Sequence, residues 1–387
     1  NAGGCGGCAG LNVCGASAEG VCAGVTGGDG SASSCGCGKR CARGRAFTLP
    51  AHVRMPESLH PMEVPLFGDR AGGEAGGDEA TGEQAQRVRQ AFGERWEEKH
   101  TRLANLHQRT SGVRPPAGFC YRVLPCLVKT GDSLLQEQFA IQLIKMFQDV
   151  FDASRLPLEL HAYAVVATAP EAGLVQLVTN AASIDSLKRR NPMHNSLIDL
   201  FDLIYGSRVS RAHKRATRNF THSAAAWAVV CYLLQIKDRH NGNIMLHADG
   251  HLVHIDFGFL LSNSPGGNMN FETAPFKLTG EHVQLMGGIR SATFSKFREL
   301  VIKGFLAARK HADKILMLAE LTFEGAGRDM PCFGAGRDAL EALRSRFQLK
   351  LTRWQCARFV NDMINKSLDH WTTTCYDKYQ RCWLGIL

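Results

Sequence analysis

Apolar residues recur at helical spacing in several segments of the chain, and these segments predict most of its helices. Ser133 to Phe151 shows this spacing, and a mostly helical pattern begins at Leu197. Ala91 to Leu103 has helix-forming composition, so we expect ordered structure to begin near it. Three long helical patterns follow toward the end of the chain, at Ser295 to Glu320, Thr352 to Ile364 and Leu368 to Leu384.

The most apolar segment runs from Ser223 to Ile236 and is 14 residues long. A membrane-spanning helix needs about 20 apolar residues. We therefore predict a buried core helix here. The chain does not open with the basic and then apolar residues of a signal peptide. Its first residue is Asn1 rather than Met, which indicates a fragment or a partial gene model.

Short segments of β-type pattern interrupt the helices. Cys120 to Lys129 predicts a strand that ends in a lysine, and Gly131-Asp132 predicts the turn after it. Further strands are predicted from Tyr163, from Gly173, at Ile244 to His247 and at His251 to Ile255, the last two joined by the turn Ala248-Asp249-Gly250. A mixed α/β half thus precedes a helix-rich half, which predicts an α+β fold.

Residues 1 to 85 are rich in Gly, Ala, Cys and Pro, and we predict that most of them are disordered. Seven of the 14 cysteines lie in the first 41 residues. A zinc site among Cys5, Cys8, Cys35, Cys37 and Cys41 is the alternative, because CGGC resembles a C-x-x-C pair, but no histidine or structured spacer follows at a finger-like distance. The other seven cysteines are typical of buried, reduced thiols in a cytosolic protein.

The net charge of +9 favours an acidic partner, which could be nucleic acid, an anionic membrane or a phosphorylated substrate. No nucleic-acid recognition motif accompanies this charge, so we expect no nucleic-acid partner.

The stretch KDRHNGNIMLHADGHLVHIDFG, from Lys237 to Gly258, carries the clearest chemistry. Asp238 is followed five residues later by Asn243, and Asp256 opens a D-F-G triplet. Protein kinases combine a catalytic-loop Asp, an Asn five residues later and a metal-binding D-F-G Asp to transfer phosphate from ATP. Asn243 and Asp256 offer the hard oxygen ligands that Mg²⁺ prefers, with Mn²⁺ as the alternative ion. A coincidental turn between two strands is the competing interpretation, and the length of the match disfavours it.

The order D-R-H, rather than H-R-D, resembles the phosphoinositide kinases and the related large kinases. His240 follows Asp238 by two residues, so either side chain is a candidate for the catalytic base, and the sequence leaves both open.

VLPCLVKTGDSLLQEQFA, from Val123, resembles the strand lysine and the G-D-D-L-R-Q-E/D motif of that superfamily. The resemblance implies that Lys129 contacts the ATP phosphates, that Glu137 orients this lysine or assists metal binding, and that Asp132 supports the local network. Leu135 departs from the family, which has a polar residue there.

Gly173 to Ile184 is similar to the hinge between kinase lobes, and Val178 with its neighbouring backbone would then bind adenine. The resemblance implies a two-lobed, protein-kinase-like fold with a small mixed α/β N-lobe and a larger, mainly helical C-lobe. The expected organisation is low complexity over 1–85, N-lobe and hinge over 86–180, and C-lobe over 181–387. The phosphate-covering loop is expected near Phe92 to Gly118, but its sequence pattern is indistinct, and an incomplete N-lobe is therefore an open alternative.

LLQIKDRHNGNIML and HIDFGFLLSNSPGGNMNFETAPFKLT closely resemble the type III beta phosphatidylinositol 4-kinases. SNSPGG and the ending SLDHWTTTCYDKYQRCWLGIL are most similar to the plant and algal branch. The resemblance implies a lipid kinase that phosphorylates the 4-hydroxyl of phosphatidylinositol. A catalytically impaired membrane scaffold and a protein kinase of the large DNA-damage-response type are the alternatives.

The predicted activation segment, Phe259 to Leu278, contains one base, Lys277, and one acid, Glu272. An already phosphorylated inositol head group would need several Lys or Arg in this segment. The near absence of charge favours unphosphorylated phosphatidylinositol as the substrate.

Two segments suit an anionic membrane surface. Gly206 to Phe220 has five Arg or Lys and no acid, although a solvated helix face is an equal alternative. The last predicted helix carries Trp371, Tyr376, Tyr379 and Trp383, which suits an interfacial helix or packing on the C-lobe. The resemblance implies a cytoplasmic protein that a small GTPase or adaptor recruits to the surface of Golgi, trans-Golgi or related endomembranes.

Overall fold

The computed structural model describes residues 82–112, 122–265, 273–327, 329–368 and 385–386, all of which belong to one compact unit, Glu63–Leu387. The predictions made for the first 81 residues, including the cysteine-rich segment, lie outside these ranges. Two further predicted segments also lie outside the described ranges. They are residues 266–272 of the activation segment and the C-terminal helix with its four aromatic residues.

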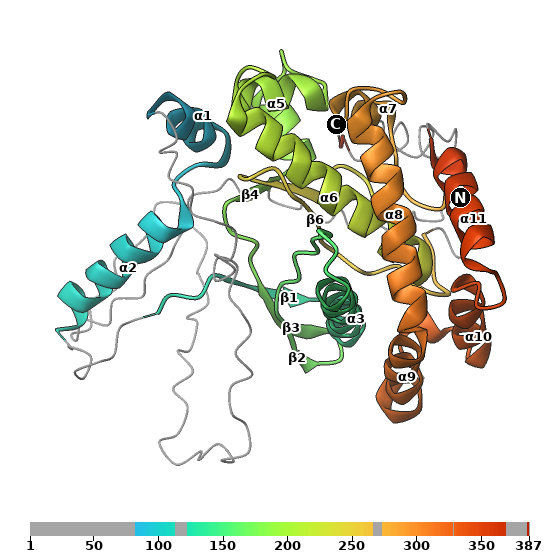
Figure 1. The fold of residues 1–387 in the computed structure, drawn as a ribbon. Helices are drawn as coiled ribbons and strands as arrows, with labels where there is room; N and C mark the ends of the chain where they lie inside the picture. The colour runs from blue at the N-terminus through green and yellow to red at the C-terminus, as the bar shows by residue number, and fades with distance from the viewer. Residues whose placement is uncertain (1–81, 113–121, 266–272, 328, 369–384, 387) are drawn as a thin grey trace, which may run out of the picture. The chain divides into compact units, whose positions relative to one another are not determined.

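The first sheet is antiparallel, in the order β1 (Cys126–Thr130), β3 (Ala172–Gln176), β2 (Val165–Ala169). Gly173 lies opposite Lys129, and a Cβ at Gly173 would meet the Val166 carbonyl oxygen at 2.4 Å, so this strand position requires glycine. The long helix α3 (Leu134–Ala153) lies beside this sheet (Figure 1). The hydroxyl of Ser133 caps α3 by accepting the N–H of Gln136, as its position before an apolar periodic segment favours.

The second sheet is also antiparallel, in the order β4 (Ala181–Ser183), β5 (Ile244–His247), β6 (Leu252–His254). The β5–β6 hairpin confirms the two short strands predicted there. The pairing of β4 with β5 was not predicted, and it joins the hinge segment directly to the hairpin.

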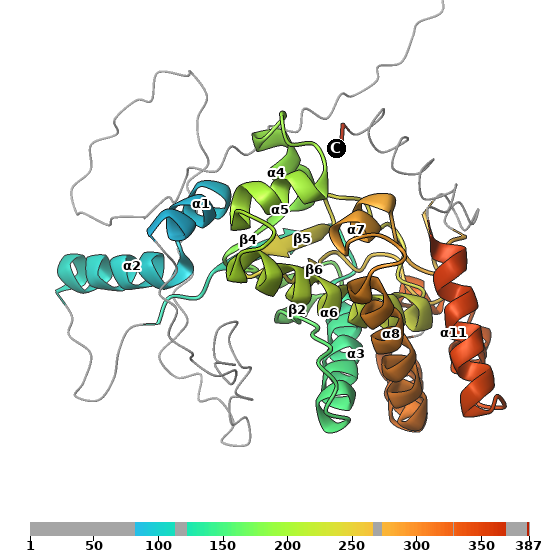
Figure 2. The same cartoon turned by 45° about the horizontal axis from the view of Figure 1, so that its top comes forward.

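Helix α6 (Arg211–Leu234) contains most of the apolar segment that begins at Ser223, and that part of the helix is buried as predicted. Helix α8 (Ala292–Lys310) lies beside α6, with α11 (Arg353–Ser367) on the far side of α8 (Figures 1 and 2). Gly304 of α8 permits this close approach, because a Cβ there would meet Leu158 at 2.7 Å and Val229 at 3.2 Å.

The other described helices surround these elements. They are α1 (Gly82–Phe92), α2 (Trp96–Ser111), α4 (Ile184–Arg190), α5 (Leu197–Tyr205), α7 (Gly280–Leu285), α9 (Ala312–Thr322) and α10 (Arg337–Arg346), with a π-helical turn at Phe323–Gly327 and a 3₁₀ turn at Pro331–Phe333. The small antiparallel sheets in the first half and the helix-rich second half confirm the predicted α+β, two-lobed kinase-like fold class.

Several predicted bounds were wrong for identifiable reasons. The helix expected over Ala91 to Leu103 is two helices, since Gly93 has a φ of 85° and separates α1 from α2. The strand expected from Cys120 begins only at Cys126, after Pro125, which has no N–H to donate to a strand partner. The helix expected over Ser295 to Glu320 is interrupted at His311, whose φ and ψ are −111° and 19°.

The range predicted for the phosphate-covering loop is also corrected in part. Helix α2 occupies most of that range up to Ser111, and Gly112 ends it in the left-handed conformation with a φ of 65°. Residues 113–121, the remainder of the range, lie outside the described residues.

Candidate active site

The open end of the β5–β6 hairpin brings Asn243 and Asp256 to the same place. Asn243 precedes β5 directly, and Asp256 follows β6 by two residues. The N–H of Ile255 donates to the carbonyl oxygen of Asn243 at 3.1 Å, which continues the strand pairing past the ends of both strands. A pair of neighbouring oxygen-bearing side chains therefore results from local hairpin geometry.

The amide of Asn243 is buried and oriented by Asp238. Its Nδ2 donates to the Asp238 carbonyl oxygen at 3.0 Å and to Oδ2 of the same residue at 3.3 Å. Both aspartates of the site have left-handed backbones, with φ of 63° at Asp238 and 62° at Asp256. Such conformations cost about 1 kcal/mol or more for a residue other than glycine and occur preferentially at functional sites.

Arg239 holds the catalytic loop against the D-F-G triplet, and sequence reasoning missed it. Its buried guanidinium donates to the carbonyl oxygens of Lys237 at 2.9 Å and Ile255 at 2.8 Å, and to that of Asp256. The guanidinium also lies over the Phe257 ring, 5.6 Å from its centroid. A buried cation satisfied by backbone carbonyls gives no periodic or spacing signal; the one signal in the sequence is its position between Asp238 and His240.

Lys129 lies among three carboxylates, each of which belongs to the predicted site. Its Nζ is 3.0 Å from Asp132 Oδ2, 3.1 Å from Glu137 Oε2 and 4.0 Å from Asp256 Oδ1. Partial burial lowers the pKa of Lys129, but the charges of Asp256 and Glu137 outweigh it and the net effect raises the pKa to about 12. The strand lysine is thus a fixed cation at the D-F-G aspartate.

Tyr163 and Gln136 are two further residues of the site that sequence reasoning missed. The Tyr163 hydroxyl donates to Glu137 Oε1 at 3.0 Å and accepts the N–H of Asp256 at 3.3 Å. The buried Gln136 amide donates to the carbonyl oxygens of Phe257 at 3.0 Å and Gly258 at 2.7 Å. These contacts attach α3 and the segment before β2 to the D-F-G triplet.

His240 lies beside Asp238 in a defined tautomer. Its Nδ1 accepts the N–H of Gly242 at 3.1 Å, so the neutral ring carries its proton on Nε2, which lies 3.9 Å from Asp238 Oδ2. Burial lowers the pKa of His240, against the opposing charge of Asp238, so the ring is neutral near pH 7.

The hinge segment lies between the two sheets, from the end of β3 to the start of β4. Val178 is half-buried and packs against the core. Asn180 anchors the segment, since its Oδ1 accepts the N–H of Trp96 at 2.7 Å and its carbonyl oxygen accepts the N–H of Ala248 at 2.8 Å. Helix α2 is thereby joined to the hinge, which the sequence did not predict.

The donor set fits a hard divalent cation and a phosphate chain. Because Nδ2 of Asn243 is engaged by Asp238, its Oδ1 is the atom that can serve as an oxygen ligand, at the same end of the hairpin as Asp256. Lys129 adds a cation 4.0 Å from Asp256 Oδ1. This combination suits Mg²⁺ bound to ATP phosphates, for which Asn243 and Asp256 are the candidate ligands.

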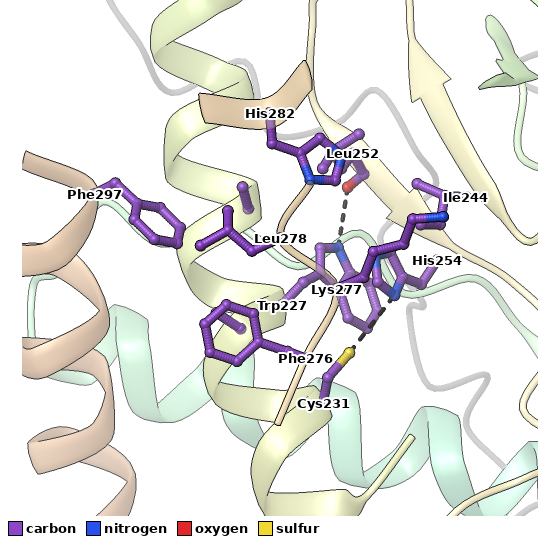
Figure 3. Close-up of a pocket in the computed structure, with 12 residues that line it drawn as sticks. Trp227, Cys231, Ile244, Leu252, His254, Phe276, Lys277, Leu278, His282 and Phe297 are labelled. Atoms are coloured by element: carbon purple, nitrogen blue, oxygen red, sulfur yellow. Dashed lines mark hydrogen bonds between the residues drawn. The ribbon is translucent and has the colours of Figure 1, made fainter. Parts of the chain in front are cut away.

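A small cavity lies behind the hairpin, between β6 and α6 (Figure 3). The Trp227 indole stacks on His254 with ring centroids 4.2 Å apart, its N–H donates to the Leu252 carbonyl oxygen at 3.1 Å, and Cys231 contacts His254. The cavity volume is about 20 Å³, room for about one water molecule. It is therefore part of the packing behind the site and not a nucleotide pocket.

Comparison with known proteins agrees with this geometry. Residues 124–333 match the family described as "Phosphatidylinositol 3- and 4-kinase". The chain is 43% identical over 295 residues to "Phosphatidylinositol 4-kinase" of Dictyostelium discoideum, and 44% identical over 301 residues to "Phosphatidylinositol 4-kinase beta 1" of Arabidopsis thaliana. It is 41% identical over 267 residues to "Phosphatidylinositol 4-kinase beta" of Rattus norvegicus.

These matches cover 76%, 76% and 69% of this chain but only 24%, 26% and 32% of the three relatives. The chain thus spans about a quarter to a third of the length of these curated relatives. The resemblance to beta-type phosphatidylinositol 4-kinases is confirmed, plant members included. More than half of the chain matches the family, and its lysine, catalytic loop and D-F-G triplet meet in one site; the chain belongs to the phosphatidylinositol 3- and 4-kinase family.

Proposed function

We propose that this protein transfers the γ-phosphate of ATP to the 4-hydroxyl of phosphatidylinositol at a membrane surface. The observation that carries the proposal is the meeting of Lys129 with Asp256 across 4.0 Å, beside an Asn243 amide oriented by Asp238. Phosphoryl transfer needs positioned cations and a group near the attacking hydroxyl, and this constellation supplies both. Nothing in the described residues favours the scaffold alternative.

Kinases of this family use ATP and a divalent cation. In the proposed mechanism Asn243 and Asp256 hold Mg²⁺, and Mn²⁺ is the other ion that suits their oxygen atoms. The bound ion neutralises charge on the phosphate chain. Lys129 binds the phosphates, Glu137 and Asp132 orient Lys129, and the backbone near Val178 binds adenine.

The geometry favours Asp238 over His240 as the group that accepts the proton of the substrate hydroxyl. The lone pair on Nδ1 of His240 is occupied by the N–H of Gly242, and Nε2 carries the proton of the neutral ring. His240 is therefore suited to donate a hydrogen bond to the transferring phosphate. The Asp238 carboxylate, whose Oδ2 lies 3.9 Å from that Nε2, is then the proposed acceptor of the hydroxyl proton.

The charge of the activation segment supports unphosphorylated phosphatidylinositol as the substrate. Its one base, Lys277, donates to Asn241 Oδ1 at 3.3 Å and so lies at the catalytic loop. The segment has no other Lys or Arg that could bind a second phosphate on the inositol ring. The 4-position rests on the resemblance, and the three relatives carry phosphatidylinositol 4-kinase in their names.

The membrane part of the proposal rests on the exposed basic residues before and along the first turns of α6. Arg208, Arg211, Lys214, Arg215 and Arg218 are all exposed. Each basic residue near an anionic surface contributes about 1 kcal/mol to binding. No helix among the described residues has the length and apolar character needed to span a bilayer. Golgi or trans-Golgi membranes, with a small GTPase or adaptor as recruiter, are proposed on the resemblance alone.

The test is to incubate the purified chain with ATP, Mg²⁺ and phosphatidylinositol vesicles, and to identify the lipid product against 3-, 4- and 5-phosphate standards. We expect phosphatidylinositol 4-phosphate from the wild type and from Asp313→Asn, a matched change on the exposed face of α9. Asp256→Asn should lower the rate at least about 100-fold, because it weakens a metal ligand. A product phosphorylated at another position, or full activity in Asp256→Asn, would overturn the proposal.

A further inference from the structure

Five titratable side chains meet at the turn end of the β5–β6 hairpin, away from Asn243 and Asp256 at its open end. They are Glu159 and His161, from the segment before β2, and His247, Asp249 and His251, from the turn. Since β5 alone spans about 13 Å, this cluster is separate from the phosphate-transfer site. The proposed mechanism uses none of the five.

His251 is the centre of the cluster and the most buried of its members. Its side chain is 6% exposed, its Nδ1 lies 2.8 Å from Asp249 Oδ1, and its Nε2 lies 2.7 Å from Glu159 Oε2. The His161 ring lies against it, with centroids 4.8 Å apart. The candidate ligand atoms of Glu159, His161 and His251 all lie within 4.8 Å of one another.

Asp249 fixes the orientation of the His251 ring. Its Oδ1 also accepts the His251 backbone N–H at 3.1 Å and lies 2.7 Å from Nδ1 of His247. A carboxylate bound to one imidazole nitrogen, with the other nitrogen directed at a metal, is the usual arrangement around histidine ligands. Nε2 of His251 is buried and makes no hydrogen bond of acceptable geometry with any described residue, although the Glu159 oxygen is close.

We propose that Glu159, His161 and His251 form a binding site for Zn²⁺, with Asp249 as the outer carboxylate that orients His251. Two imidazoles and one carboxylate are a known zinc ligand set, and water would complete the tetrahedron. Ligand atoms around tetrahedral zinc lie about 3.4 Å apart. Binding would therefore move Nε2 of His251 and Oε2 of Glu159 apart from 2.7 Å, and would draw together the ligand atoms that are up to 4.8 Å apart. Glu159, whose side chain is 47% exposed, gives the ion access from solvent.

A simple ion pair accounts for less of the cluster. Protonated His251 between Asp249 and Glu159 would leave the His161 ring packed against a charged imidazole. Zinc would use both rings as ligands. It would also join the segment before β2 to the hairpin, which is a stabilising role and not a catalytic one.

The test measures zinc content and thermal unfolding of the full chain in excess Mg²⁺. Metal is first removed with a chelator, Zn²⁺ is added back, and unbound ion is removed. We expect His161→Gln and Glu159→Gln each to bind one equivalent of zinc less than the wild type. We also expect added Zn²⁺ to raise the unfolding temperature of the wild type by several degrees more than that of either variant. Asp249→Asn should weaken zinc affinity about 10- to 100-fold without removing the site.

The exposed His107 of α2 supplies the matched control, since His107→Gln should bind as much zinc as the wild type. The difference between variants also separates this site from zinc held by the cysteines of residues 1–41. Circular dichroism establishes that each variant is folded. Equal zinc content in the wild type, His161→Gln and Glu159→Gln would overturn the proposal. Lipid kinase activity is not part of the readout, so failure here leaves the proposed function unaffected.

Discussion

The hydroxyl of Tyr163 donates a hydrogen bond to the Glu137 carboxylate over 3.0 Å and joins it to the D-F-G backbone, because the same oxygen accepts the N–H of Asp256. Glu137 in turn holds Nζ of Lys129 at 3.1 Å. One buried tyrosine therefore connects the strand lysine, the α3 glutamate and the D-F-G aspartate. Burial raises the pKa of Tyr163 well above its usual value, so the hydroxyl keeps its proton and remains a donor.

Tyr163→Phe should lower kcat for the lipid about 10-fold, since Glu137 loses a donor and the Asp256 N–H loses its acceptor. The measurement is steady-state turnover with varied ATP and saturating lipid. Tyr205→Phe is the matched control, because it removes a hydrogen bond to the His247 carbonyl oxygen, at the other end of the hairpin. A kcat for Tyr163→Phe within about twofold of the control would contradict the positioning role.

Lys129→Met should lower turnover more than about 100-fold, because a cation aimed at the phosphates is lost. It should also lower the free energy of unfolding by about 2 kcal/mol, since the buried Glu137 carboxylate loses its partner. Adding Glu137→Gln should restore part of the stability but none of the activity, which a double-mutant cycle by chemical denaturation measures. Lys145→Met, a half-buried lysine of α3, is the control for the loss of a lysine. Equal instability of the single and double variants would argue against the ion pair.

Gln136→Leu should destabilise the fold by about 2–4 kcal/mol, because it leaves buried backbone groups without partners. The side chain donates to the Phe257 and Gly258 carbonyl oxygens and accepts the N–H of Cys332 at 2.8 Å. Urea unfolding measures the effect. Gln142→Leu, on the exposed side of the same helix, should change stability by less than about 0.5 kcal/mol. Similar values for the two variants would show that these backbone contacts contribute little.

His282→Gln should make the protein less sensitive to acid. Burial, and next the charges of Lys277 and Lys188, lower the pKa of His282 from 6.5 to about 3. Between those values the unfolded chain binds the proton and the folded one does not. The contribution to stability is therefore fully present above pH 6.5 and is lost as the pH falls toward 3.

The expected difference is about 1 kcal/mol in the free energy of unfolding between pH 7.5 and 5.5, measured by urea unfolding of wild type and variant. Glutamine keeps the capping box, in which His282 accepts the Thr279 N–H at 3.3 Å, so the helix start is preserved. His107→Gln should retain the acid sensitivity of the wild type. An unchanged pH dependence in His282→Gln would exclude this histidine as a source of it.

Local patterns were sufficient for part of the site. Asn243 and Asp256 flank two short strands joined by a tight turn, so a hairpin alone brings them together, and the spacing from Asp238 follows from the same loop. The lysine at the end of β1 and the glutamate one turn into α3 are also close in sequence, and their contact at 3.1 Å needs only the Gly131-Asp132 turn. Contacts of this kind can be predicted from the sequence because few residues separate the interacting groups.

Other parts depended on packing between distant segments. Tyr163 is 93 residues from Asp256, Gln136 is 121 residues from Phe257, and neither stands in a motif that indicates its partner. The partner of β4 was likewise not predictable from the sequence, because β4 pairs with β5, which lies far along the chain. The bounds of α1, α2 and α9 were missed because single residues, Gly93 and His311, leave helical geometry within otherwise helical composition.

The sequence by itself determined the fold class and the family, and it indicated several charged groups of the candidate site, since these depend on periodicity and on short spacings in the chain. Only the tertiary structure decided how those groups are held: Arg239 between backbone carbonyls, the proton of His240 on Nε2, and Tyr163 between Glu137 and Asp256. It also brought Glu159 and His161 to the hairpin turn. The physical reason is that hydrogen bonds and ligand sets require proximity in space, which packing of separate elements creates and which sequence spacing does not record.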